Sequence, residues 1–162
     1  MRSNFEIGVG MVEGVVAGNP VAFGKFKLNI AAAALAIGGC ATAPVPDGQA
    51  VSVPLQRVAA PDLLQRTAGS GVLVVTRDAG ATGAACYARL HVDGRSVADI
   101  STSERIEMYL PAGEHILSMM LVGSLCGGGL VESAVVIDPA KPKRYRVGFG
   151  GSMEFRLQPT AF

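Results

Sequence analysis

Beyond Gly71 the sequence consists of short segments in which apolar and polar residues alternate, separated by Gly, Pro and Asp. In C-Y-A-R-L-H-V (86–92), Cys, Ala, Leu and Val fall on one face, and Tyr87, Arg89 and His91 fall on the other. Successive side chains of a β-strand point to opposite faces, so this period of two predicts strands with one buried face. Helical periodicity is absent after residue 68, which argues against a helical or α/β fold.

Eight segments are expected to be strands, some alternating and others rich in β-branched residues, with turns of suitable chemistry between them. Asp93-Gly94 favours a hairpin, because both central positions of such a turn adopt positive φ. We expect strands at 71–77, 86–92, 95–101, 104–110, 114–122, 130–138, 143–149 and 153–158, the last two joined across Gly150-Gly151. Seven or eight short strands predict an all-β fold, a small antiparallel β-sandwich of the immunoglobulin or transthyretin kind over residues 71–158, with a tail at 159–162.

A second feature lies before the sandwich, where residues 25–39 have the parts of a secretory signal. Lys25 and Lys27 are followed by an apolar run, Leu28 to Ile37. Ten residues in a helix rise about 15 Å, half of the ~30 Å hydrocarbon core, so a cleaved signal is favoured over a membrane-spanning helix. The closing I-G-G-C, which ends at Cys40, resembles the lipobox of bacterial lipoproteins.

The lipobox resemblance implies that the thiol of Cys40 receives diacylglycerol and that cleavage leaves Cys40 as the acylated N-terminus. Three acyl chains, palmitate among them, would anchor the protein firmly at ~0.8 kcal/mol per buried methylene. Residue 41 is Ala rather than Asp, which by resemblance to enterobacterial sorting favours the periplasmic face of the outer membrane. The alternative is an ordinary buried helix with a core cysteine.

The rest of the N-terminal part carries little pattern. Residues 1–24 precede the signal, and we assign them no fold or function. Residues 40–70 are expected to form a tether, since 41–50 is rich in Ala, Pro and Gly and has no periodicity. Within it, A-P-D-L-L-Q-R (60–66) places Pro and Asp where a helical turn begins, so at most one short helix is expected there.

Charge and composition exclude some classes of function. The chain has 14 Lys and Arg against 13 Asp and Glu, and 11 of each remain after residue 39. A balanced chain lacks the basic surface of a nucleic-acid-binding protein. No motif for a cofactor is present, and no metal site is expected because His91 and His115 are not spaced as ligand pairs with the cysteines.

Two cysteines, Cys86 and Cys126, remain once Cys40 is acylated. An even number in an oxidising compartment predicts a disulfide, which would close a loop of about 40 residues. Two unpaired buried thiols are the alternative, and a redox-active pair is disfavoured because the chain has no C-x-x-C spacing. The glycines at 127–129 would let the backbone bend beside the bond.

Two stretches, R-L-H-V-D-G-R-S-V-A-D-I (89–100) and M-Y-L-P-A-G-E-H-I-L (108–117), resemble the repeated pattern of PEGA-like domains. They are also similar to related β-sandwich lipoprotein domains of unknown function in proteobacteria. The resemblance covers about residues 71–158. It implies an extracytoplasmic sandwich used as a binding or spacing module, with no catalytic residues to transfer.

Catalytic patterns are weak. There is no G-x-S-x-G, and the nearest sequence, G-G-S-M (150–153), lies in an expected hairpin turn. His91 should point outward and His115 should be a structural histidine at a sheet edge. We expect the acidic residues Glu104, Glu107, Glu114 and Glu132 to form a solvated face.

One cluster of charge remains, K-P-K-R-Y-R, with basic residues Lys141, Lys143, Arg144 and Arg146. These side chains could bind lipid phosphates, lipopolysaccharide or peptidoglycan carboxylates. The favoured interpretation is an outward basic edge that resists edge-to-edge pairing.

The sequence therefore predicts a non-enzymatic envelope lipoprotein that presents a disulfide-stapled sandwich in the periplasm. The membrane is contacted through the N-terminal lipid, and an envelope protein or peptidoglycan is the expected partner. The alternative is a small periplasmic hydrolase or inhibitor with a site near Cys126, the glycine triplet and His115.

Overall fold

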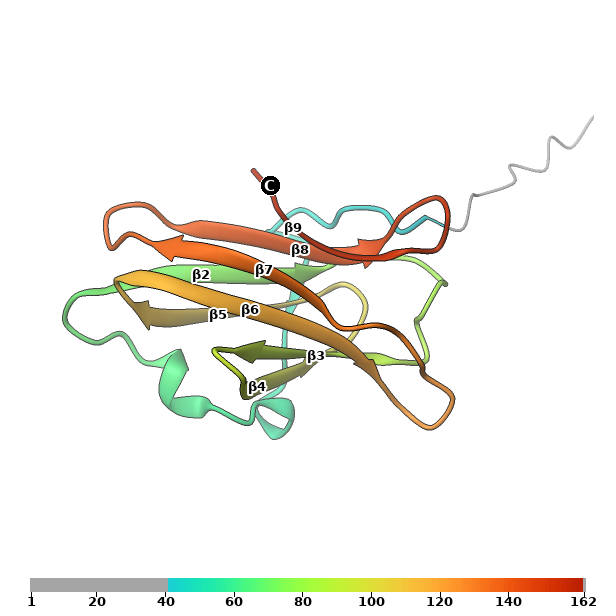
Figure 1. The fold of residues 1–162 in the computed structure, drawn as a ribbon, viewed down its shortest axis with the longest axis horizontal. Coiled ribbons are helices and arrows are strands. Elements are labelled where there is room, and N and C mark those ends of the chain that lie inside the picture. The colour runs from blue at the N-terminus through green and yellow to red at the C-terminus, as the bar shows by residue number, and fades with distance from the viewer. Residues whose placement is uncertain (1–40, 162) are drawn as a thin grey trace, which may run out of the picture. The chain divides into compact units, whose positions relative to one another are not determined.

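A computed structural model describes residues 41–161, which form two β-sheets packed face to face (Figure 1). The larger sheet has the order β1 (Val51–Ser52), β5 (Glu104–Pro111), β2 (Ser70–Arg77), β8 (Lys143–Phe149) and β9 (Phe155–Pro159). The smaller sheet has the order β4 (Arg95–Ile100), β3 (Tyr87–Val92), β6 (Gly113–Val122) and β7 (Val131–Ile137). The predicted all-β sandwich is confirmed, and β2 to β9 match the eight expected segments.

The core follows from the alternation of side chains along the strands. Leu73 and Val75 of β2 meet Leu90 of β3 and Met119 of β6 in one buried cluster between the sheets. Each buried aliphatic side chain of this size contributes about 1.5–3 kcal/mol relative to exposure. In β3 the outward residues are Tyr87, Arg89 and His91, so this strand has only one way to place its apolar face.

Strand direction differs in part from the expected antiparallel arrangement. Five of the seven strand pairs are antiparallel, but β1 pairs with β5 and β2 pairs with β8 in parallel. Parallel neighbours need a long crossover. The chain supplies one between β2 and β8, because it passes through the whole smaller sheet before returning beside Arg77.

The turns behave as the sequence predicts. Asp93 and Gly94 have φ of 50° and 78° between β3 and β4, as the expected hairpin requires. The β8–β9 hairpin contains Gly150 and Gly151, and its backbone is closed by a bond from Gly150 N–H to the Glu154 carbonyl at 2.9 Å.

The expectation of a free tether over residues 40–70 is wrong for its described part. Ala43 pairs with Ala79, residues 51–52 form β1, and Val58 bridges to Ala98 at the outer edge of β4. Pro-rich composition suggested a mobile linker. However, proline is also compatible with an extended segment at a sheet edge, and here buried apolar side chains hold such a segment in place. The segment belongs to the sandwich.

Two apolar side chains of this segment are buried, Val53 and Ala60. The expected helical turn near 60–66 is present as the 3-10 helix η2 (Pro61–Leu64). A second turn, η1 (Leu55–Arg57), was not expected. Residues 1–24, the signal segment 25–39 and Cys40 lie outside the described residues. Within 41–161 no helix has the length and apolar character needed to cross a membrane.

Candidate functional site

The predicted disulfide between Cys86 and Cys126 is present, with the two Cα atoms 5.8 Å apart. Cys86 lies directly before β3 and Cys126 follows the end of β6. These two strand ends are neighbours, since Tyr87 pairs with Val122. The bond therefore fastens the long loop after β6 to the start of β3.

The glycine that the disulfide needs is Gly123 rather than the triplet at 127–129. Gly123 has a φ of 147°, and a Cβ there would lie 2.5 Å from Cys126 Sγ. None of the three triplet glycines has a positive φ. The expectation that the triplet bends the chain beside the bond is wrong, because the bend falls three residues before Cys126.

The residues of the hydrolase alternative are not brought together. Cys126 is bound in the disulfide, and His115 lies near the other end of β6. Val122 lies seven positions after His115, about 23 Å along a strand. Cys126 and His115 therefore share no site.

His115 is held by hydrogen bonds at both ring nitrogens. Its Nδ1 lies 2.7 Å from Asp93 Oδ2, and its Nε2 lies 2.9 Å from the Pro111 carbonyl oxygen. Both partners are acceptors, so the protonated ring, in which both nitrogens donate, satisfies both contacts. Burial lowers the pKa of His115, but the bonds to Asp93 and Pro111 outweigh it and the pKa is raised.

Asp93 completes this small network. Its second carboxylate oxygen accepts a bond from the Ile116 N–H at 2.9 Å. The hydrogen bond from His115, followed by that from the Ile116 backbone, lowers the pKa of Asp93. His115 thus joins the β3–β4 turn to the β5–β6 turn, as expected of a structural histidine, and neither ring nitrogen is left to act as a base.

The four basic residues do not form one patch. β8 lies between β2 and β9, so the expected basic edge strand is wrong. Arg144 Nε donates to Asp47 Oδ2 at 2.7 Å, and Arg146 Nη2 donates to Asp78 Oδ2 at 3.0 Å. Lys143 begins β8, and Lys141 lies before it in the turn that follows β7.

The glutamates also separate, and the expected solvated face is wrong for Glu104. It pairs with Arg57 and accepts a bond from the Ser101 N–H at 2.8 Å, and its side chain is only 14% exposed. Glu107 accepts a bond from the Tyr109 hydroxyl at 3.2 Å. Glu114 is exposed on β6, and Glu132 belongs to a different cluster on β7.

That cluster lies on the outer face of the smaller sheet and was not predicted. His91, Ser118 and Glu132 sit side by side on β3, β6 and β7, because His91 pairs with Ser118 and Ser118 pairs with Glu132. An open groove of about 320 Å³ follows this row. Its lining residues are His91, Gly94, Ser118, Met120, Leu130 and Glu132.

The row has the residue types of a hydrolase but not the geometry. Ser118 Oγ donates to Glu132 Oε1 at 2.6 Å, so its proton points away from His91. His91 Nδ1 is buried and has no hydrogen-bond partner among the described residues. Activation of a serine needs a bond to the histidine. The groove therefore offers hydrogen-bonding groups and apolar walls for binding rather than an activated nucleophile.

Several apolar side chains are exposed on these strands, and Leu130 among them lines the groove. Ile116 on β6, Leu130 before β7 and Val136 on β7 are exposed, as is Tyr87 at the start of β3. The signal was present in the sequence, since the even-numbered positions of β6 face outward and include Ile116, Ser118 and Met120. Outward apolar residues beside a polar row are typical of binding surfaces.

A second polar cluster surrounds Asp78, which is only 1% exposed. Its Oδ2 accepts bonds from Thr42 Oγ1 at 3.2 Å and from Arg146 Nη2 at 3.0 Å. Burial raises the pKa of Asp78, against the lowering effects of Arg146 and Thr42. Gly148 lies alongside, and a Cβ there would collide with Asp78 Oδ2 and Thr42 Oγ1. This cluster fastens the start of the described chain to β8.

Among residues 41–161, no group of three or more His, Cys, Asp or Glu side chains could hold a metal ion. Comparison of the chain with protein-family models, with curated proteins and with solved structures gives no match.

Proposed function

We propose that this chain is a lipid-anchored protein of the bacterial cell envelope whose β-sandwich is a binding module. The I-G-G-C segment that ends at Cys40 carries the proposal. The disulfide between Cys86 and Cys126 supports it, because such bonds persist in oxidising compartments and are rare in the cytosol. The resemblance to PEGA-like lipoprotein domains points to the same class.

The proposed location is the periplasmic face of the outer membrane. Ala41 follows the lipidation site, and Asp at this position is the residue associated with retention in the inner membrane. Acyl chains on Cys40 would supply the membrane attachment. No stretch of the described chain needs to cross the bilayer for this arrangement.

The outer face of the smaller sheet is the proposed binding surface. Its polar row supplies the Glu132 carboxylate and the Ser118 hydroxyl that is bonded to it. Ile116, Val136 and Leu130 add exposed apolar area around the row. A segment of an envelope protein with one apolar side chain and one hydrogen-bonding group fits this chemistry.

Crosslinking in the native envelope, followed by capture of the acylated protein, tests this function. We expect Ile116→Glu and Val136→Glu to lose most of the crosslinked partner, because a carboxylate in an apolar contact opposes binding. Leu55→Glu is the control, since Leu55 is also exposed but lies in η1, which follows β1 of the larger sheet. Equal capture by all three variants would overturn the proposed surface.

A further inference from the structure

The described chain begins at a fixed place on the sandwich. Thr42 N–H donates to the Phe149 carbonyl at 3.0 Å, and Phe149 N–H donates to Thr42 Oγ1 at 2.8 Å. Ala43 and Ala79 exchange two backbone bonds of 2.8 and 2.9 Å. Residues 42 and 43 are therefore held at the end of the sandwich where β2 and β8 end.

This attachment leaves almost no slack before the proposed lipidation site. Ala41 alone separates Thr42 from Cys40. Two residues of extended chain span at most about 7 Å. If Cys40 carries the lipid, the end of the sandwich that holds Thr42 must lie at the bilayer surface.

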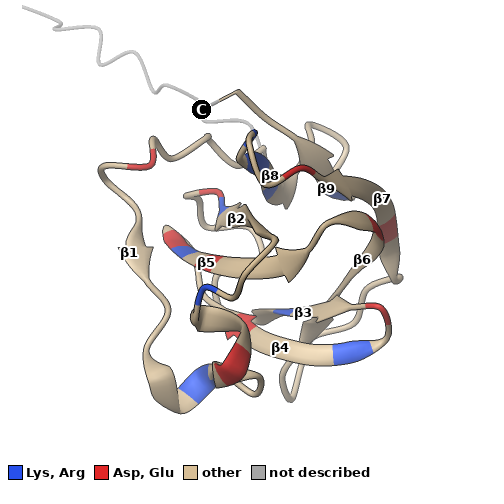
Figure 2. Cartoon of the chain, turned by 90° about the vertical axis from the view of Figure 1, so that its left-hand side faces the viewer, with Lys and Arg blue, Asp and Glu red and all other residues tan. Residues whose placement is uncertain are grey.

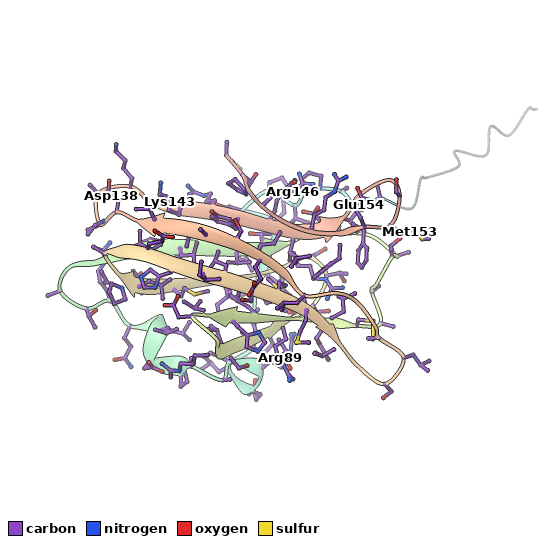
Figure 3. All side chains as sticks on the ribbon, in the orientation of Figure 1. Arg89, Asp138, Lys143, Arg146, Met153 and Glu154 are labelled. Carbon is purple, nitrogen blue, oxygen red and sulfur yellow. A yellow bond between two sulfur atoms is a disulfide. The ribbon has the colours of Figure 1, made fainter. Side chains whose placement is uncertain are left out.

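Three loops share that end, and two of them carry exposed apolar tips. The loop after β2 is bound there, because Arg77 Nη1 donates to the Cys86 carbonyl at 2.6 Å. The disulfide brings the loop after β6, which contains Leu125, to the same place. The β8–β9 hairpin contributes Met153, which lies at this end in Figure 3.

The two apolar tips are the most exposed large apolar side chains of these loops. Leu125 is 100% exposed and Met153 is 61% exposed. Single exposed apolar residues are ordinary on a protein surface. Here two of them project from separate loops, beside the residue that leads to the anchor.

The charges at the two ends of β8 differ. Beside Met153, the carboxylates Asp78 and Glu154 are paired with Arg146 and Arg156. Lys143 lies at the opposite end of β8, as Figure 3 shows, and it has no ion pair among the described residues. Acidic and basic positions are mixed over both sheets (Figure 2). Contact with lipid at the Met153 end is thus apolar rather than electrostatic.

We propose that this end of the sandwich is a second, non-covalent membrane contact, in which Leu125 and Met153 enter the boundary between lipid headgroups and acyl chains. The inference rests on the proposed acylation of Cys40. It fixes the orientation of the molecule, because the turns at Ala112 and Lys141 then face away from the bilayer. In this orientation the smaller sheet runs parallel to the bilayer normal, so its groove does not face the lipid.

Tryptophan fluorescence tests the contact, since the chain contains no Trp. The variants L125W and M153W place the reporter at the two tips. A112W is the control, because Ala112 is exposed in the turn after β5, and Pro111 pairs with Ser70 at the other end of β2. Each acylated full chain is reconstituted in phosphatidylethanolamine and phosphatidylglycerol vesicles with bromine on the acyl chains near the headgroup.

We expect bromine to remove most of the emission of L125W and M153W, with a shift to shorter wavelength, and to leave A112W unchanged. The effect should persist in high salt, because apolar insertion is not screened. Protein that floats with the vesicles while L125W and M153W stay unquenched would overturn the orientation and leave the anchor standing. Protein that does not float would overturn both the anchor and the orientation.

Discussion

Arg77 is the largest fully buried side chain of the described protein and is 2% exposed. Its guanidinium donates to the carbonyls of Gly83, Cys86 and Ile100 at 2.6, 2.6 and 2.8 Å. Among residues 41–161 it has no ion pair with a carboxylate. Burial lowers its pKa, opposed by the charge of Glu104. The N–H groups of this planar guanidinium thus join the loop after β2 to the end of β4.

Arg77→Ala is expected to destabilise the fold by about 3 kcal/mol, because it removes three hydrogen bonds to backbone carbonyls and opens a cavity. Arg95→Ala is the matched control, since Arg95 pairs with Asp62 at the surface, where ion pairs contribute little to stability. Urea unfolding followed by circular dichroism measures both. Equal losses in the two variants would contradict a structural role for the buried guanidinium.

The pair of His115 and Asp93 predicts a pH dependence. The pKa of folded His115 is raised above its ordinary 6.5. Its stabilisation is therefore fully present below 6.5 and is lost as pH rises through the folded pKa. We expect wild type to exceed His115→Gln in unfolding free energy by more at about pH 5.5 than at about pH 8.5.

The size of this pH effect is limited by solvent. The Asp93 side chain is half exposed, so the change should be about 0.5 kcal/mol. Unfolding in urea at the two pH values, with His91→Gln as the comparison, measures it. A difference that grows with rising pH would show that the ring is neutral in the folded protein.

At the scale of an element, residues 42–60 pair with the edges of the sandwich, and Thr42 lies beside Gly148. Gly148→Ala puts a methyl group against both Asp78 and Thr42, and overpacking of this kind costs about 1–3 kcal/mol. Gly151→Ala is the control, because no atom lies within 4 Å of its added Cβ and its φ is not positive. Hydrogen exchange of the Thr42 and Ala43 amides should increase in Gly148→Ala alone. Unchanged hydrogen-exchange protection of these two amides would mean that contacts away from Gly148 hold Thr42 and Ala43.

The disulfide is a second feature that stabilises the arrangement of the elements. It spans 40 residues of sequence, for which loop-closure entropy gives about 4 kcal/mol. Replacing both Cys86 and Cys126 by Ala should lower the unfolding free energy by about this amount, while reductant has no further effect on the variant. An unchanged unfolding midpoint would indicate that the bond constrains the unfolded chain little.

The sandwich was predictable from the sequence because a period of two leaves each strand one choice of buried face. β3 shows this, with Ala88, Leu90 and Val92 buried as expected. Strand direction was not predictable for β2 and β8, since their pairing depends on where the chain returns after the smaller sheet. Nor was the packing of residues 42–60, because its hydrogen bonds are to distant backbone groups.

The candidate site was harder to foresee for a similar reason. Ser118, His91 and Glu132 are far apart in the sequence, and only the register of three strands places them in one row. The disulfide was predicted because setting Cys40 aside as the expected lipidation site leaves two of the three cysteines, which allow one pairing. The split of the basic cluster could not, since Asp47 and Asp78 come from distant segments.

At the scale of the whole molecule, Thr42 is held on the sandwich two positions after the proposed lipidation site. A lipid on Cys40 would hold the disulfide end at the bilayer and present the sheet faces to the periplasm. This orientation depends on acylation of Cys40.

Mass spectrometry of the protein purified from its own cell envelope tests that chemistry. We expect a chain that begins at Cys40, carries fatty acyl groups on that residue and holds Cys86 and Cys126 as a disulfide. Cys40→Ser should leave the full-length chain without acyl groups. A native chain that starts elsewhere, without fatty acid and with three reduced cysteines, would contradict the lipoprotein proposal.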